Sequence, residues 1–163
     1  MINILILLII IALIIEFSRN KWDIYGNLFN NYFFSVLRKV EYDGHLTGAT
    51  WLLFGCLSAI YLFSIKIAVV ALLVLTIGDA LAAVIGKSFP LLRIGNKSLF
   101  GTLVAIFVTF SFIVSLDIGL GWEIILLGTI FGMLIELIPS YINDNITIPI
   151  ASGLAMTVGL KIL

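Results

Sequence analysis

The chain has 163 residues, of which 62% are hydrophobic and 11% are charged, and its nine basic residues balance its nine acidic residues. A soluble domain of this length cannot bury so much apolar surface, so the composition predicts an integral membrane protein that is all-α and polytopic. A net charge of zero gives no bulk attraction to nucleic acid, and we expect no nucleic-acid partner. The single cysteine, Cys56, excludes a disulfide within the chain.

Long apolar runs predict a bundle of membrane-spanning helices, with connections that carry most of the charge. The first run would be only about 21 Å long as a helix, against a hydrocarbon core of about 30 Å, so we expect five to six spans. Basic and aromatic side chains alternate over residues 16–45, which predicts a helix at the membrane interface. No linker divides the chain, so we expect one catalytic domain over residues 1–163. In chain order the predicted segments are 2–15, 46–65, 67–85, 99–116, 124–142 and 146–163.

The basic residues are distributed unevenly over the connections between these segments. The connections after the second and fourth segments contain only one basic residue, Lys66. The positive-inside rule therefore places the other connections in the cytoplasm and both termini outside. The polar stretches 38–45, 86–98 and 143–145 would then face the cytoplasm. The basic residues of the cytoplasmic connections are Arg19, Lys21, Arg38, Lys39, Lys87, Arg93 and Lys97.

Two acidic residues lie inside apolar segments, and a third follows at a turn. Asp79 precedes the end of its segment by about 9 Å of helix, too deep for a short carboxylate to reach bulk water, which favours a polar cavity or a bound cation. Glu136 repeats this pattern in the fifth segment, and Asp144 lies in the turn that follows. Carboxylates from separate segments suit Mg²⁺ with substrate phosphates. The alternative is an acid that pairs with a basic residue for packing.

The basic loop 86–98 ends where the fourth segment begins. Lys97 and Ser98 lie at this helix start, where free backbone N–H groups and the positive end of the dipole favour phosphate. The alternative is that Ser98 only caps the helix and Lys97 only follows the positive-inside rule. Gly128 and Gly132 have the spacing of a helix-packing pair, which is also compatible with a homodimer.

These motifs, in this order along the chain, resemble the CTP-dependent lipid kinase family, which includes dolichol kinase, phytol kinase and the CTP-dependent diacylglycerol kinase. The family is more distantly similar to the phosphatidate cytidylyltransferases. The chain departs from the dolichol kinase pattern at Phe100, where that branch often has glutamate. The motifs are Arg38-Lys39-x-Glu41, Leu46-Thr47-Gly48-Ala49-Thr50, Gly78-Asp79-x-x-Ala82, Lys97-Ser98-x-x-Gly101-Thr102, Glu136 and Asp144-Asn145-x-x-x-Pro149.

The resemblance implies transfer of the γ-phosphate of CTP to a membrane lipid alcohol, with Mg²⁺ as cofactor. It implies metal ligands in Asp79 and Asp144. It implies catalytic roles for Asp79, Glu136 and Glu41, with Glu136 or Glu41 accepting the hydroxyl proton. Two alternatives remain open: a cytidylyltransferase that acts on a lipid phosphate, and a small ion-coupled transporter. The implied nucleotide-binding residues are Arg38, Lys97, Ser98, Gly101 and Asn145.

Overall fold

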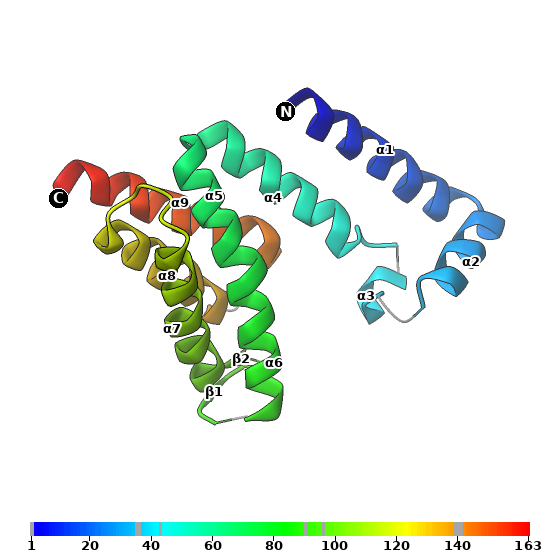
Figure 1. Cartoon of the computed structure of the whole chain (residues 1–163). Helices are drawn as coiled ribbons and strands as arrows, with labels where there is room; N and C mark the ends of the chain where they lie inside the picture. The colour runs from blue at the N-terminus through cyan, green and yellow to red at the C-terminus, as the bar shows by residue number, and fades with distance from the viewer. Residues whose placement is uncertain (1, 35–36, 43, 90, 96, 139–141) are drawn as a thin grey trace. The chain divides into compact units, whose positions relative to one another are not determined.

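The computed structural model describes residues 2–34, 37–42, 44–89, 91–95, 97–138 and 142–163, and it is helical apart from one short hairpin (Figure 1). The chain divides into two compact units, Met1–Leu57 and Ser58–Leu163, which we call unit 1 and unit 2. The helix α4, Gly48–Leu62, begins in the first and ends in the second.

Unit 1 begins with the apolar helix α1, Ile2–Lys21, followed by α2, Asp23–Tyr32, and the short α3, Lys39–Tyr42. The prediction that the first helix ends at residue 15 is wrong, because α1 continues through a buried pair of opposite charges at Glu16 and Arg19. At 20 residues α1 is long enough to cross a membrane. Trp22 has an extended backbone and separates α1 from α2.

Unit 2 contains one long interrupted helix: α5, Ile65–Leu73; η1, Val74–Asp79; and α6, Ala80–Ser88. The middle piece, η1, is a π-helix, which apolar periodicity does not predict. After a hairpin follow α7, Leu99–Ser115; α8, Trp122–Leu137; and α9, Asp144–Ile162. The core lies between these helices and contains buried side chains from each of them, among them Val70, Val74, Ala82, Ala105, Met133 and Met156.

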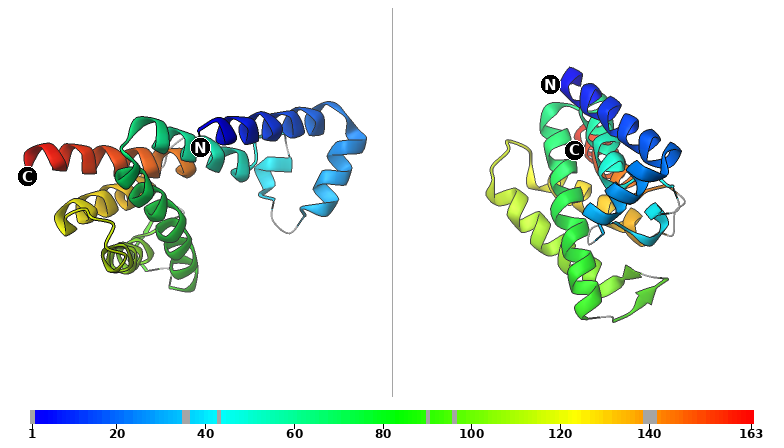
Figure 2. Two further views of the ribbon diagram at one scale, coloured as in Figure 1. Left: turned by 45° about the horizontal axis from the view of Figure 1, so that its top comes forward. Right: turned by 90° about the vertical axis from the view of Figure 1, so that its right-hand side faces the viewer.

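Small residues allow close helix contacts in this core. A Cβ atom at Gly128 would lie 2.5 Å from Cγ of Met156, and one at Gly132 would lie 3.1 Å from Cβ of Ser152. The predicted packing role of Gly128 and Gly132 is thus confirmed, and the contact joins α8 to α9. The helices α6 and α7 pack against each other, and the right-hand view of Figure 2 shows the hairpin that joins them.

The predicted ends of two segments are wrong. The fifth was expected to reach residue 142, but α8 ends at Leu137 and Ile138 is extended, as residues before a proline usually are; positions 139–141 lie outside the described residues. The sixth begins earlier than expected, at Asp144, because Asn143 caps it. Pro149 therefore lies inside α9 and not in its first turn.

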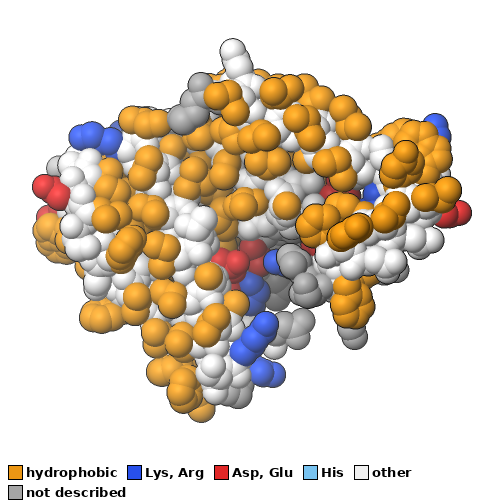
Figure 3. All heavy atoms as spheres, turned by 45° about the vertical axis from the view of Figure 1, so that its right-hand side comes forward, with side chains coloured by type: hydrophobic (Ala, Val, Ile, Leu, Met, Phe, Trp, Pro, Cys, Tyr) orange, Lys and Arg blue, Asp and Glu red, His pale blue; other side chains and the backbone are white. Residues whose placement is uncertain are grey.

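In the part of the chain that the structure describes, three helices are long and apolar enough to cross a membrane: Ile2–Lys21, Ile65–Ser88 and Asp144–Ile162. The apolar helices α4 and α7 are shorter. Hydrophobic side chains also cover much of the face shown in Figure 3. These features are compatible with a polytopic membrane protein.

Candidate functional site

Three acidic side chains of unit 2 meet around the ammonium of Lys97. Its Nζ atom lies 2.8 Å from Oδ2 of Asp144, 3.0 Å from Oε1 of Glu136 and 4.0 Å from Oδ1 of Asp79. The three acids come from the end of η1, the end of α8 and the first residue of α9. We call Asp79, Lys97, Glu136 and Asp144 the Lys97 cluster. The sequence predicted each member as a site residue, and the structure brings these four together.

The π-helix and a glycine position Asp79. Gly78 faces α8 so closely that a Cβ atom there would lie 2.5 Å from Sδ of Met133. Glu136 follows Met133 by about one helical turn, so the same contact brings Asp79 and Glu136 to one end of the two helices. A π-turn changes the angular spacing of an α-helix and often occurs at functional sites.

The hairpin β1, Arg93–Ile94, and β2, Lys97–Ser98, presents Lys97. The next residue, Ser98, is buried; its Oγ atom accepts a hydrogen bond from the backbone N–H of Gly101 and lies 3.1 Å from the carbonyl oxygen of Leu91. Ser98 thus caps α7 and joins it to the loop. Gly101 packs against α6, where an added Cβ atom would lie 2.7 Å from the carbonyl oxygen of Ala82. The structure gives Ser98 and Gly101 packing roles, and their contact with a nucleotide stays a prediction.

The start of α9 positions Asp144. The side chain of Asn143 accepts a hydrogen bond of 3.1 Å from the backbone N–H of Asn145, which fixes the first turn. A carboxylate in the first turn also interacts favourably with the positive end of the helix dipole. Asn145 is half-buried, and its predicted nucleotide contact stays a prediction.

Exposure divides the cluster into three accessible groups and one buried group. The side chains of Lys97, Asp79 and Asp144 are 35%, 29% and 34% exposed, whereas that of Glu136 is 2% exposed. Burial lowers the pKa of Lys97, but its hydrogen bonds to Asp144 and Glu136 outweigh burial and leave the pKa raised. Lys97 is therefore an ammonium at neutral pH. Since one ammonium faces three carboxyl groups, the cluster favours a further cation or hydrogen-bond donor.

The acidic side chains of the Lys97 cluster are of the kind that binds Mg²⁺. Within the described ranges, no three His, Cys, Asp or Glu side chains are grouped so that they could hold a metal ion. The ammonium of Lys97 lies among the carboxylates instead. Mg²⁺ is usually bound by one or two carboxylates together with substrate phosphates. Asp79 and Asp144 therefore fit a Mg²⁺ that arrives with a phosphate, and their role as metal ligands stays a prediction.

The two predicted site residues of unit 1 are Arg38 and Glu41. Glu41 is buried, and both of its carboxylate oxygens accept hydrogen bonds from backbone N–H groups, of Arg38 at 3.0 Å and of Gly48 at 2.9 Å. Glu41 thus stabilises the starts of α3 and α4. The side chain of Arg38 is exposed, and its contact with phosphate stays a prediction.

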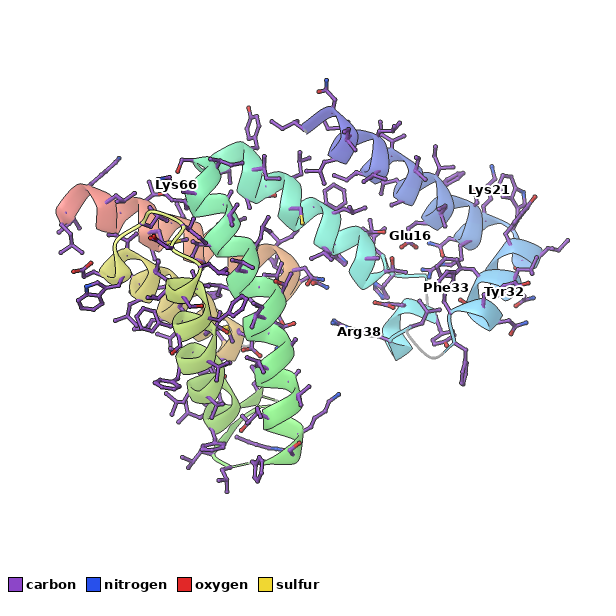
Figure 4. All side chains as sticks on the ribbon, in the orientation of Figure 1. Glu16, Lys21, Tyr32, Phe33, Arg38 and Lys66 are labelled. Carbon is purple, nitrogen blue, oxygen red and sulfur yellow. The ribbon has the colours of Figure 1, made fainter. Side chains whose placement is uncertain are left out.

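Glu16 has a structural role in unit 1 that was not predicted from the sequence. Its Oε1 atom accepts hydrogen bonds from the backbone N–H of Thr47 at 2.7 Å and from the hydroxyl of Thr50 at 3.1 Å. Its Oε2 atom lies 3.0 Å from Nη2 of Arg19 in an ion pair without hydrogen-bond geometry, and Arg19 donates to the carbonyl oxygen of His45. Figure 4 labels Glu16 among these side chains. Opposite charges at the helical spacing i, i+3 were the available signal.

No family model matches the chain, and no curated protein or solved structure matches it either.

Proposed function

We propose that this chain is a CTP-dependent kinase that transfers the γ-phosphate to a membrane lipid alcohol. The observation that carries the proposal is the Lys97 cluster, in which one ammonium and three carboxyl groups from separate elements meet in a chain with long apolar helices. The motifs that resemble the CTP-dependent lipid kinases contain all four residues of the cluster.

The chemistry of phosphoryl transfer suits this arrangement. Such a transfer needs positioning and neutralisation of charge more than covalent catalysis. Lys97 would contact a phosphate oxygen, and α9 begins at its partner Asp144, where the positive end of the helix dipole favours an anion. Mg²⁺, held by Asp79 and Asp144 with the phosphates of CTP, would supply further neutralisation. Ser98, Gly101 and Asn145 complete the proposed nucleotide-binding set of unit 2, and Arg38 of unit 1 is a further proposed phosphate contact.

The proposed membrane arrangement has five to six spans, a cytoplasmic active site and both termini outside. The tail of the alcohol would remain in the bilayer while its hydroxyl reaches the cluster. Phytol-like, polyprenol-like and diacylglycerol-like alcohols all meet this requirement.

In the decisive experiment, purified protein is incubated with Mg²⁺, mixed lipid alcohols and CTP that is labelled at either the γ- or the α-phosphate. Transfer of the label to lipid is measured, and γ-labelled ATP is the comparison. Transfer of label to lipid from γ-labelled CTP alone supports the kinase. Transfer from α-labelled CTP would instead indicate a cytidylyltransferase. Absence of transfer from either label contradicts both, and an ion-flux assay in vesicles would then test the transporter.

Asp79→Asn tests the cluster within this assay. We expect γ-phosphate transfer to fall on the order of a hundredfold or more, because a charge that helps to hold the phosphates is lost while the shape is kept. Asp117→Asn is the matched control, since Asp117 is exposed and its φ of 45° is one that asparagine tolerates. Wild-type turnover in Asp79→Asn would exclude Asp79 from the site.

A further inference from the structure

We propose that Glu136 is the catalytic base that accepts the hydroxyl proton of the lipid alcohol, through its Oε2 atom. This inference rests on the proposed kinase function. The sequence left two candidates for the base, Glu41 and Glu136, and the structure separates them.

The two acids differ in what their carboxylate oxygens contact. Each oxygen of Glu41 already accepts a hydrogen bond from a backbone N–H group, so this carboxylate is part of the local backbone structure. Glu136 contacts Lys97 through Oε1, while Oε2 is buried and has no hydrogen-bond partner among the described residues. A buried carboxylate oxygen without a partner is unfavourable, since its desolvation is not compensated. A hydroxyl that donates to Oε2 would remove this cost.

The position of Glu136 beside Lys97 suits a base in phosphoryl transfer. The same ammonium that would contact a phosphate oxygen lies 3.0 Å from Oε1 of Glu136. Burial disfavours the charged form of Glu136, and the ammonium at that distance opposes this effect by favouring the ionised carboxylate, which is the form that accepts a proton. It also keeps the acid close to the phosphate that the alcohol must reach.

The hydroxyl proton passes to Oε2 of Glu136 while the alcohol oxygen forms a bond to the γ-phosphorus of CTP. The bond between the γ-phosphorus and the bridging oxygen breaks, and CDP leaves with the electron pair. The lipid phosphate and a protonated Glu136 result, and the proton then passes to solvent.

The test compares wild type with Glu136→Gln, which keeps the shape of the side chain and removes the base. The assay follows γ-labelled CTP with two acceptors, phytol and an analogue of phytol made more acidic by fluorine beside the hydroxyl. We expect kcat with phytol to fall by about 10²–10⁴-fold while the KM for CTP is unchanged. The fall in kcat should be smaller with the fluorinated alcohol, because a more acidic hydroxyl depends less on a base.

Two variants complete the design. Glu123→Gln, at the other end of α8, should behave as wild type. Glu136→Asp keeps a carboxylate but shortens it, and should show a smaller defect that also narrows with the fluorinated alcohol. This variant decides the question if Glu136→Gln does not purify as a single species.

The outcomes separate the base from the kinase function. If wild type transfers label and Glu136→Gln retains its kcat, Glu136 is not the base and the kinase function stands. Glu136 is also not the base, and the kinase function stands, if Glu136→Gln lowers kcat equally for both alcohols. If wild type transfers no label from CTP, the kinase function and the base are both wrong.

Discussion

At the residue scale, the main feature of the molecule is that one lysine forms ion pairs with three acidic side chains. Lys97 lies in a short strand. Its acidic partners are distant in the sequence, and Asp144 lies 47 positions after it. Removing the lysine charge lowers the free energy of unfolding by more than the ion pairs contribute on balance, because the remaining acids are left without their partner. A substitution in the Lys97 cluster should therefore change the stability of the protein as well as the chemistry of the proposed site.

Lys97→Met should lower the free energy of unfolding by about 1–3 kcal/mol, less than for a fully buried pair because Lys97 is partly exposed. Thermal or denaturant unfolding in detergent would measure this, with Lys87→Met, in the exposed last turn of α6, as the control. The raised pKa of Lys97 means that its contribution is complete below the ordinary lysine pKa and is lost as pH rises through the higher folded-state value. The difference between wild type and Lys97→Met should thus shrink only in strongly alkaline solution. Equal stability of the two proteins at neutral pH would contradict the role of Lys97.

At the element scale, the position of the cluster depends on how closely α6 and α7 approach. A Cβ atom at Gly101 would lie 2.7 Å from the carbonyl oxygen of Ala82 and 2.9 Å from the backbone nitrogen of Gly86. Both are backbone atoms, so neither can rotate away. The two helices would have to separate, and Lys97 lies just before Ser98, the residue that caps α7.

Gly101→Ala should therefore cost about 1–3 kcal/mol of stability and reduce phosphate transfer, even though alanine favours helix over glycine. The matched control is Gly159→Ala in α9, where the nearest atom is Cδ1 of Leu127, the end of a side chain that can adjust. Unfolding and turnover would be measured for both. Equal effects of the two substitutions would show that the close contact of α6 and α7 at Gly101 does not require glycine.

The sequence predicted the elements better than the contacts between them. Unbroken apolar runs indicate helices, and segment 99–116 agrees with α7, Leu99–Ser115, because a serine cap marks its start. The π-helix was missed, because its backbone depends on how η1 packs against its neighbours and not on local periodicity. The acids were identified because charge is costly in an apolar helix. That Lys97 lies at their centre depends on the tertiary contacts of α8 and α9, which no local pattern contains.

At the scale of the whole molecule, the long helix Ile65–Ser88 separates two ends of unit 2. At its start, Lys66, labelled in Figure 4, donates a 3.0 Å hydrogen bond to the carbonyl oxygen of Gly119. Beyond its end lies the hairpin that carries Lys97. A helix of 24 residues is about 36 Å long, enough to place these ends on opposite sides of a bilayer.

The proposed orientation predicts which end faces the cytoplasm. In a Cys56→Ser background, Ile94→Cys places a thiol in the exposed hairpin and Ile65→Cys places one at the exposed start of α5. The positive-inside rule predicts that a membrane-impermeant maleimide labels Ile65→Cys in intact cells and labels Ile94→Cys only after the membrane is opened. The reverse pattern would place the Lys97 cluster outside, away from cytoplasmic CTP, and would contradict the kinase proposal. Labelling of both thiols in intact cells would show that Ile65–Ser88 does not span the bilayer, and the cluster would then need a different route to a lipid substrate.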